Sequence, residues 1–426
     1  MQRQTITRQT LDNGLRVAVR SVPATPSVGI ALYYDVGSKD EVPGRSGFAH
    51  LFEHLMFQGS ARAAKGEHMR LIQSWGGEMN GSTSQDRTNF YAALPSSQLA
   101  LGLWLEADRM QALDLSAENF ENQRQTVMEE RKQVIDDQPY GLAGLRLGEL
   151  SHQNWAYSHP VIGSFEDLQA ARFEEAVDFH RAWYRPDNAT LGIAGDIDPI
   201  EAFELVESYF GDILPADSQA PLPARASLEE PPREGPRVET LYDPLARLPG
   251  VFINHLVPPC THPDFFVYEL IETILFRGPS SRLHRRMVID DPVALQIAGG
   301  HDPRRGPGLF SLSAISSTSL DAVVSAYFEE LARLAAEPPS GAELVRAHNQ
   351  LRAAWLFAQE SSLAMAMSIG RAMVFYGSPD WDEHYLDTMA SITAEDVQRV
   401  VSEGFSPDQR VELRVLPGGE DSRADS

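Results

Sequence analysis

Short apolar runs alternate along the chain with longer stretches in which apolar residues recur every three or four positions. The runs at 27–36 (SVGIALYYDV), 88–95 (TNFYAALP) and 188–195 (NATLGIAG) are typical of strands. The stretches at 99–113 (LALGLWLEADRMQAL) and 120–135 (FENQRQTVMEERKQVI) have the periodicity of helices. Strands mixed with helices in this way, in both halves of the chain, predict two α+β domains, each a sheet with helices packed on one face.

The middle of the chain has a different composition. Residues 215–237, PADSQAPLPARASLEEPPREGPR, are rich in proline, alanine and charge and show no apolar periodicity. This composition is typical of an exposed linker. The chain has 426 residues, which is more than one compact core usually contains. We therefore predict two domains, 1–214 and 238–426, joined by a linker at 215–237.

The two predicted domains share a sequence pattern. In each, a strand-like run is followed by polar residues and then by an amphipathic stretch that ends at a glycine: SVGIALYYDVG and FAHLFEHLMFQGS in the first, GVFINHLV and VYELIETILFRGPSS in the second. At a constant offset of 219, the matching pairs are Leu51 and Leu270, Glu53 and Glu272, Phe57 and Phe276, and Gly59 and Gly278. Two unrelated helices with glycine C-caps are the alternative, but the shared order favours a duplication. The two copies differ at two aligned positions. The first copy has His50 and His54 there, and the second has Glu269 and Thr273.

Charge and cysteine content narrow the classes of function. The formal net charge is −24, from 36 Lys plus Arg against 60 Asp plus Glu. This balance disfavours nucleic acid and anionic lipid as partners and favours cationic ones, although it also serves solubility. Cys260 is the only cysteine, so a disulfide framework and a thiolate zinc site are both excluded. Any metal must be held by histidines and carboxylates.

The polarity of the N-terminal residues and the length of the apolar runs bear on the location of the protein. The polar start, MQRQTITRQTLDNGLRVAV, has no apolar core of the kind that leader peptides have, and later no run of about 18 apolar residues occurs. We therefore expect a soluble protein without a membrane span. It is cytoplasmic if the chain is complete and periplasmic if a leader was removed.

Residues 50–54, His-Leu-Phe-Glu-His, form the pattern H-x-x-E-H within a stretch of helical periodicity. At about 100° per residue, His50 and His54 lie about 40° apart on one face of a helix, with Glu53 beside them. Two imidazoles one turn apart can bind one zinc ion, and a free carboxylate on that face can act as a base. A surface helix with two solvated histidines is the alternative. The apolar residues at 51, 52 and 55–57 disfavour this alternative, because they indicate that the helix is buried. Buried His and Glu side chains need polar or metal partners.

A catalytic zinc site needs a third protein ligand from elsewhere in the chain. The predicted helix at 120–135 offers three glutamates, Glu121, Glu129 and Glu130. Position alone does not choose among them. On a helix Glu129 and Glu130 point about 100° apart, so only one of the two can face the metal.

Five segments, in order, carry a family resemblance: LDNGLRVAV, GRSGFAHLFEHLMFQGS, GGEMNGSTSQDRTNFYAALP, NQRQTVMEERKQVIDDQPYG and WYRPDNATLGIAGDID. Together with H-x-x-E-H and a glutamate some 76 residues later, they resemble the pitrilysin family of inverzincins. They resemble particularly its short, two-domain members related to the mitochondrial processing peptidase. In that family the third ligand is the glutamate that begins an E-R-R-like stretch, which here is Glu130 in Glu130-Arg131-Lys132.

The resemblance implies both a fold and an activity. It implies two homologous α+β domains, each a mainly antiparallel sheet with helices packed on it, which together form half of a clam-shell. The first domain would bind one Zn²⁺ per chain through His50, His54 and Glu130, and the second would have no metal ligands. With Glu53 as the base, the chain would be a zinc endopeptidase that hydrolyses short or unfolded peptides. The alternatives are a non-catalytic core or assembly subunit of the same family and a zinc hydrolase acting on a non-peptide bond.

The resemblance also assigns residues around the metal. Family members often carry a second glutamate seven residues before the third ligand, where this chain has Gln123. An amide can still accept a hydrogen bond from a ligating imidazole but brings no charge, so zinc affinity would be somewhat weaker. The strand that begins with Asn80, Gly81, Ser82 and Thr83 would be the edge that pairs with an extended substrate peptide. An ordinary sheet strand after a glycine-rich turn is the alternative.

One family feature is missing from the second domain. In the family an Arg and a Tyr, a few residues after a Ser-Arg-Leu motif, help to stabilise the transition state. Here the motif is present at 281–283, but the two positions are Ile289 and Leu295. Neither apolar side chain can donate a hydrogen bond to a developing oxyanion. We therefore expect a heterodimer in which a zinc-less relative supplies the Arg and Tyr, with a homodimer as the alternative.

Overall fold

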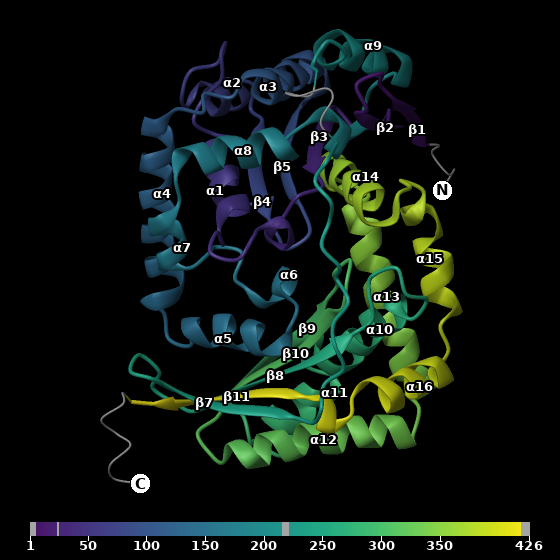
Figure 1. Ribbon diagram of the computed structural model, residues 1–426. Helices are drawn as coiled ribbons and strands as arrows, with labels where there is room; N and C mark the ends of the chain where they lie inside the picture. Colours follow the sequence, from purple (N-terminus) through teal and green to yellow (C-terminus); the bar gives the residue numbers. More distant parts are fainter. Residues whose placement is uncertain (1–5, 24, 215–220, 419–426) are drawn as a thin grey trace. The chain divides into compact units, whose positions relative to one another are not determined.

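The computed structural model of the chain describes residues 6–23, 25–214 and 221–418 (Figure 1). The chain divides into two compact units. Unit 1 comprises Met1–Glu129, Pro160–Ala226 and Trp355–Tyr385, and unit 2 comprises Glu130–His159, Ser227–Ala354 and Leu386–Ser426. Residues 215–220 of the predicted linker lie outside the described residues, and the described part from 221 to 236 contains no helix or strand. The predicted boundaries at 214 and 238 stay a prediction.

The framework of unit 1 is a six-stranded sheet. Strands β2 and β6 run parallel, and every other neighbouring pair is antiparallel. In spatial order the strands are β1 (Ile6–Thr10), β2 (Arg16–Ser21), β6 (Ala189–Gly195), β3 (Ser27–Tyr34), β5 (Thr88–Pro95) and β4 (Glu78–Thr83). Strand β4 is therefore one edge of the sheet.

Helices lie on both faces of this sheet, so the prediction of helices on one face is wrong for unit 1. Successive side chains of a strand point to opposite faces. In β3, Ile30, Leu32 and Tyr34 belong to the main core, whereas Ala31 and Tyr33 belong to a smaller cluster on the other face. The main core is shared with α1 (Phe48–Leu55), α3 (Leu99–Ala112), α4 (Ala117–Arg131), α8 (Phe173–Trp183) and α9 (Pro199–Phe210). The smaller cluster is shared with α14 (Ser362–Tyr376).

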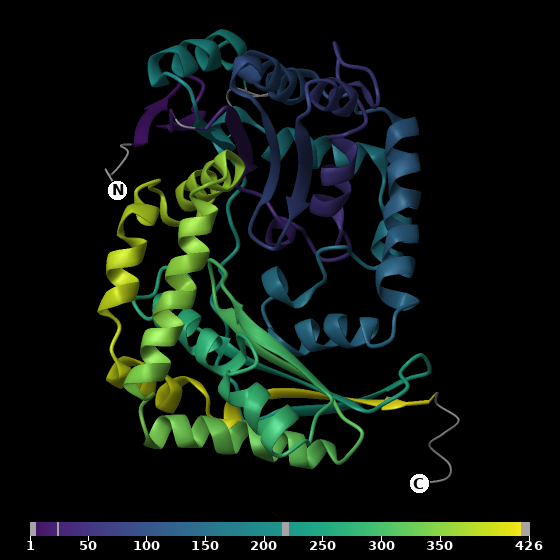
Figure 2. The same cartoon turned by 180° about the vertical axis from the view of Figure 1, so that it is seen from behind.

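Helix α14 packs against the strands of unit 1, and the view from behind shows it beside them (Figure 2). A Cβ atom built on Gly29 would lie 2.4 Å from the carbonyl oxygen of Ser362, and one on Gly192 would lie 2.4 Å from that of Ala366. Real Cβ atoms do not approach that closely, so only glycine allows the helix backbone to reach the sheet here. A helix from the second half of the sequence thus completes the core of unit 1.

Unit 2 repeats the same sheet with five strands. Their order is β7 (Arg237–Asp243), β11 (Val411–Pro417), β8 (Gly250–Val257), β10 (Gly308–Ile315) and β9 (Gln296–Asp302). The pair β7 and β11 is parallel and the remaining pairs are antiparallel, as for β2, β6, β3, β5 and β4 of unit 1. This shared order and direction confirms the prediction of two homologous α+β domains with mainly antiparallel sheets.

The helices of unit 2 also lie on its own sheet. Helix α5 (Gly141–Ser151), which comes from the first half of the sequence, packs against β8 and β11. The other contacts are made by α10 (Phe265–Phe276), α12 (Leu320–Ala336) and α16 (Ala394–Gly404).

The remaining α-helices of the two units are α2 (Glu67–Ser74), α6 (Trp155–Ser158), α7 (Phe165–Ala170), α11 (Arg282–His284), α13 (Gly341–Ala358) and α15 (Trp381–Ser391). Two π-helical turns span Lys132–Asp136 (η3) and Arg285–Asp290 (η5). Across the described ranges, no helix combines the length and apolarity needed to cross a bilayer.

Candidate metal centre

The N-terminus of helix α1 is fixed by a glycine cap and by a buried carboxylate. Gly47 caps it with a φ of 94°, a left-handed conformation that glycine adopts without strain. The buried carboxylate of Glu41 accepts hydrogen bonds from the backbone N–H groups of Gly47, at 2.9 Å, and Ala49, at 2.7 Å. These bonds satisfy two helical donors, and a negative charge near a helix N-terminus is favourable. The start of the helix, and with it the direction of its side chains, is therefore fixed.

The two faces of α1 have different environments. Leu51, Phe52 and Leu55 are fully buried in the core of unit 1, and the ring of Phe52 stacks on that of Phe179. The polar residues His50, Glu53 and His54 remain partly exposed on the opposite side. The helical period, which places residues three and four apart on one face, thus turns all three polar side chains the same way.

The structure brings His50, His54 and Glu130 together. One ligand atom from each lies within 4.8 Å of the other two, and the rings of His50 and His54 are 4.8 Å apart at their centroids. Glu130 is the next residue after Glu129 on the continuous helix α4, but Glu129 is exposed whereas Glu130 is partly buried. Among the described residues this is the only such grouping of three His, Cys, Asp or Glu side chains. Of the two neighbouring glutamates, Glu130 is thus the one that lies with the histidines, and its role as a zinc ligand stays a prediction.

Burial keeps His50 in the form that binds metal. Loss of hydration, followed by the charge of the neighbouring His54, lowers the pKa of His50 from its ordinary 6.5 to about 4. The ring is therefore neutral at neutral pH and offers a lone pair to a cation.

Gln123 lies two helical turns before Glu130 on α4. Seven residues correspond to two turns, so the two side chains share a face of that helix. The side chain of Gln123 is buried. The position that often carries a glutamate in the resembling family is thus filled by a neutral buried amide.

Glu53 is hydrogen-bonded to the edge strand β4. The hydroxyl of Thr83 donates a hydrogen bond to Glu53 Oε2 at 2.6 Å. A Cβ atom on Gly81 would lie 3.2 Å from Glu53 Cγ, so the missing side chain leaves room for the glutamate. The sequence grouped Thr83 with substrate-binding residues and missed this contact. A signal was available, because Gly81 and Thr83 are two apart on a strand and so face the same side.

The four residues expected at the start of this strand do form the end of β4. Gly81 pairs with Phe90 and Thr83 with Thr88 on β5, and in the described part of the chain β4 has no strand on its other side. Arg87 fixes the end of the strand, because its guanidinium donates to the carbonyl of Ser82 at 2.7 Å. Burial lowers the pKa of Arg87 from its ordinary value.

The second copy keeps the packing but not the ligands. Glu272 of α10, the counterpart of Glu53, accepts hydrogen bonds from the backbone of His301 at 3.1 Å and from Arg277 at 3.0 Å. A Cβ atom on Gly300, which matches Gly81 at the offset of 219, would lie 3.1 Å from Glu272 Cδ. The glutamate against an edge-strand glycine therefore belongs to the repeated fold. The added histidines and Thr83 distinguish the first copy.

Comparison with known proteins places the chain in one family. A family model described as insulinase (peptidase family M16) matches residues 16–153, and one described as the peptidase M16 inactive domain matches residues 171–351. The zinc protease PqqE of Helicobacter pylori is 28% identical over 419 residues, which cover 96% of this chain and 92% of that protein. A probable mitochondrial-processing peptidase subunit beta of Schizosaccharomyces pombe is 26% identical, covering 92% of this chain and 87% of its own length.

A solved structure agrees with these matches. The crystal structure of a protease from Helicobacter pylori has a TM-score of 0.93 and 26% identity to this chain, covering 97% of this chain and 100% of that one. The chain therefore belongs to peptidase family M16. Within that family it is similar to the short members with two homologous domains, as the resemblance to pitrilysin-type enzymes predicted.

Proposed function

We propose that the chain is a zinc-dependent endopeptidase that cleaves short or unfolded peptides. The observation that supports this most strongly is the grouping of His50, His54 and Glu130 within 4.8 Å, with Glu53 on the same helix face. Relatives named zinc proteases cover nearly the whole chain. All four residues that the chemistry requires are present.

The donor set fits zinc. Two imidazoles and one carboxylate are typical protein ligands of a catalytic zinc site, which leaves a fourth position for water or substrate. The absence of a second cysteine leaves nitrogen and oxygen as the donors. Zinc in this position would supply Lewis acidity, which lowers the pKa of water and polarises a carbonyl group.

Glu53 would carry the protons. Thr83 donates a hydrogen bond to Oε2 of Glu53 at 2.6 Å, and the carboxylate that it holds would take the proton from the attacking water. The same carboxyl group would then give that proton to the nitrogen of the leaving amine. Because the hydroxyl of Thr83 restrains the carboxylate, Glu53 keeps one orientation during both transfers.

The edge strand β4 would bind the substrate backbone. An extended peptide can add to an exposed strand edge through main-chain hydrogen bonds, which give affinity without strict sequence choice. Asn80, Gly81, Ser82 and Thr83 lie along this edge. A stably folded protein cannot present an extended segment, so we expect cleavage of flexible peptides only.

The net charge of −24 favours cationic peptides as substrates. Competition between cationic and anionic peptides at low and high salt would test this preference.

A partner would complete the site. Ile289 and Leu295, which stand where the family has Arg and Tyr, are 54% and 58% exposed. The arginines nearby are engaged: Arg285 pairs with Asp290 at 3.1 Å, and Arg286 pairs with Asp291 and Glu329. We therefore propose that a zinc-less relative supplies the missing donors, with a second copy of the chain as the alternative. Each donor is typically worth about 3 kcal/mol in such sites, or about a hundredfold in rate.

A non-catalytic subunit is the rival function. It is favoured by the match of residues 171–351 to a domain described as inactive. That match falls on the part of the chain without the ligands, whereas His50, Glu53 and His54 fall in the other match. Zinc content and cleavage of an internally quenched peptide, measured with and without the relative, separate the two. A chain that binds no zinc, or stays inactive with every relative, would be a non-catalytic subunit.

A further inference from the structure

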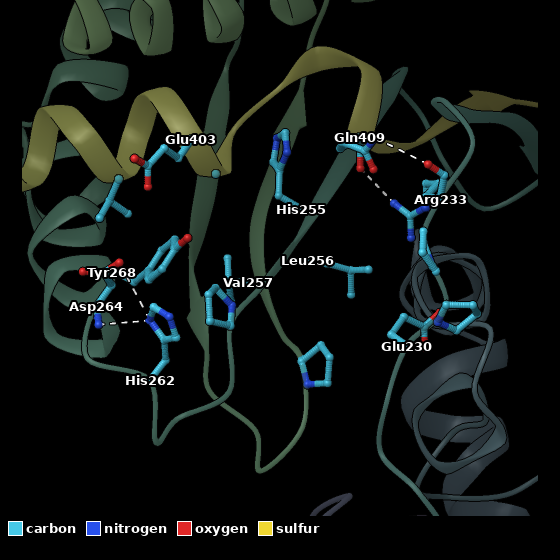
Figure 3. A pocket seen from close by; sticks show the side chains of 16 residues that line it. Glu230, Arg233, His255, Leu256, Val257, His262, Asp264, Tyr268, Glu403 and Gln409 are labelled. Atoms are coloured by element: carbon cyan, nitrogen blue, oxygen red, sulfur yellow. Dashed lines mark hydrogen bonds and ion pairs between the residues drawn. The ribbon is translucent and has the colours of Figure 1, made fainter.

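Several arginines of this acidic chain are engaged by acceptors of their own unit. In unit 1, Arg45 pairs with Glu175 at 2.8 Å. In unit 2, Arg233 lines a hollow of about 530 Å³ at the end of strand β8, with Glu230 at the same end (Figure 3). The terminal nitrogens of Arg233 donate to backbone carbonyl oxygens at 2.6 and 2.9 Å. Arginines held in this way have little capacity left for a ligand.

Two arginines of unit 1 differ, because neither pairs with a carboxylate of the described residues. Arg87 precedes strand β5, and only its Nη1 donates hydrogen bonds, to the carbonyl oxygen of Ser82 at 2.7 Å, its hydroxyl at 2.6 Å and Asn89 Oδ1 at 2.7 Å. Arg371 of helix α14 lies over the ring of Trp381, with its guanidinium carbon 5.6 Å from the ring centroid. Both side chains are partly exposed, and none of their unused nitrogens is a fully buried atom. A ligand can therefore reach these donors.

The two arginines lie on the same face of the sheet, around the ring of Tyr33. Tyr33 belongs to the smaller cluster, which is shared with α14. The guanidinium carbon of Arg87 lies 5.9 Å from the centroid of this ring, and a Cβ atom on Gly370, the neighbour of Arg371, would lie 2.5 Å from a ring carbon. Burial raises the pKa of Tyr33, and the charges of Arg87 and Arg371 oppose that rise. Two positive charges thus act on one place.

Two neutral side chains add donors to this surface. Tyr91 of β5 packs against the same smaller cluster, and its hydroxyl has no hydrogen-bond partner within the described ranges and is not a fully buried atom. Asn80 pairs with Tyr91 across β4 and β5, so the two side chains share a face. Asn80 is exposed, and its Oδ1 accepts from the backbone of Gly81 at 2.8 Å, which leaves the amide nitrogen for a ligand. Arg87, Arg371, Tyr91 and Asn80 are here called the arginine patch.

The nearest glutamates lie away from the arginine patch. Glu53 is on the other side of β4, where it accepts the hydrogen bond from Thr83, because residues 81 and 83 face opposite to residues 80 and 82. Glu78 is on the same face as Asn80, but four residues before Ser82, which is roughly 13 Å along a strand. The groups that the patch offers are therefore two cations, a hydroxyl and an amide nitrogen. This is a donor set for a carboxylate, which a guanidinium binds through strong, charge-assisted hydrogen bonds.

We infer, on the basis of the proposed function, that the arginine patch binds one carboxylate of the peptide that adds to strand β4. The carboxylate is either an acidic side chain or the C-terminus of the peptide. Side chains of an added strand alternate between the two faces of the sheet. Those on the face of Asn80 and Ser82 come beside Arg87, whose guanidinium reaches over β4 to Ser82. The charge of −24 would attract cationic peptides from a distance, and the patch would select one carboxylate close to the cleaved bond.

Peptide binding to the zinc-loaded Glu53→Gln chain, measured by fluorescence anisotropy, tests this assignment without turnover. The probes are labelled flexible peptides of about ten residues with blocked, uncharged ends, in which Glu or Gln is placed at each position in turn. A further pair ends in a free carboxylate or in an amide. At one position, or at the free C-terminus, we expect the carboxylate form to bind at least about tenfold more tightly than its neutral counterpart.

The two kinds of peptide distinguish an acidic side chain from the C-terminus as the source of the carboxylate. The negative charge of the chain would weaken binding of every acidic peptide alike, so a gain at one position is specific. No gain at any position or at the C-terminus, or no saturable binding by any of the peptides, would overturn the assignment.

A substitution of Arg371 links the gain to the patch. Arg371→Gln removes a partly exposed group without breaking a hydrogen bond of the described residues, so it should fold, and it should reduce the gain to less than about threefold. The matched control is Arg181→Gln on helix α8, which packs on the other face of the sheet; the side chain of Arg181 is 55% exposed. This control should keep the gain. A wild-type gain in Arg371→Gln, or an equal loss in Arg181→Gln, would contradict the role of Arg371.

Reversal of the charge gives a second, independent test. In Arg371→Glu, a peptide with Lys at the selected position should bind more tightly than the peptide with Gln, and the peptide with Glu more weakly. An unchanged preference for Glu would refute the patch. These readouts separate the patch from the proposed function. A chain that selects the carboxylate but whose wild type cleaves no peptide would keep the patch and lose the peptidase, and cleavage without any difference between Glu and Gln would do the reverse.

Discussion

At the scale of single residues, Glu129 and Glu130 are neighbours with opposite environments. Glu130 lies with the two histidines, and Glu129 is exposed on α4. Glu130→Gln removes a charged ligand, so the purified chain should lose most of its zinc, with affinity falling by roughly tenfold or more. Glu129→Gln is the matched control and should keep wild-type zinc in metal analysis. The reverse pattern would show that the ligand assignment is wrong.

Thr83 is predicted to position Glu53 without binding metal. Thr83→Val removes the hydroxyl that restrains Glu53 Oε2 but keeps the shape of the side chain. We expect the rate of peptide cleavage to fall by roughly tenfold, with kcat affected more than KM, because a misoriented base transfers protons poorly. Thr83→Ser restores the hydroxyl and should restore most of the rate, and zinc content should be unchanged in both. Equal rates for Thr83→Val and the wild type would remove this role.

The candidate site was partly readable from the sequence for a simple geometric reason. His50, Glu53 and His54 lie within one turn of one helix, so their spacing alone predicts a shared face. Glu130 comes from a different helix, and only the family resemblance singled it out. The bond between Thr83 and Glu53 depends on how α1 docks on β4, which no local pattern encodes.

At the scale of secondary structure, the predicted strand at 27–36 corresponds to β3 at Ser27–Tyr34, and the predicted helix at 99–113 to α3 at Leu99–Ala112. Their periodicity reflects burial, so local patterns were sufficient. The partner of the second face of β3 was not predictable, because α14 lies more than 300 residues later in the chain. The small residues on that face, such as Gly29, are the only local trace of its close approach.

This close approach makes a prediction about stability. Gly29→Ala would place a Cβ atom 2.4 Å from the backbone of Ser362, so the variant should lose about 1–3 kcal/mol of unfolding free energy. Gly144 in helix α5 is the control, since a Cβ atom there meets nothing within 4 Å. Gly144→Ala should gain about 0.5–1 kcal/mol in the same urea titration, because alanine favours a helix. A neutral Gly29→Ala would mean that α14 can move away from the sheet at no cost.

At the scale of the whole molecule, buried histidines should make the fold sensitive to acid. Burial is the first cause that lowers the pKa of each of five rings, to about 2 for His68, about 3 for His255, and about 4 for His152, His180 and His301. As pH falls from about 6.5 toward 4, the unfolded chain binds protons that the folded chain does not. Stability should therefore be constant above pH 7 and fall below about 6.5.

Each fully buried ring contributes at most about 1.4 kcal/mol per pH unit within that window. Urea midpoints measured at pH 7, 6 and 5 check the expectation. His255→Phe, which removes one of these rings, should show a smaller decrease between pH 7 and 5 than the wild type. A midpoint that does not change over this range would contradict the neutral, buried state of these histidines.

In the proposed site, Glu53 acts as the base of hydrolysis beside a zinc ion held by His50, His54 and Glu130. The most direct measurement is the rate of cleavage of an internally quenched peptide by the wild type and by Glu53→Gln, each loaded with one zinc per chain and assayed with the zinc-less relative. Glu53→Gln should retain its zinc and lose at least about a hundredfold in rate, because it lacks the base but keeps every ligand. Equal rates at equal zinc content would contradict the role of Glu53 as the base.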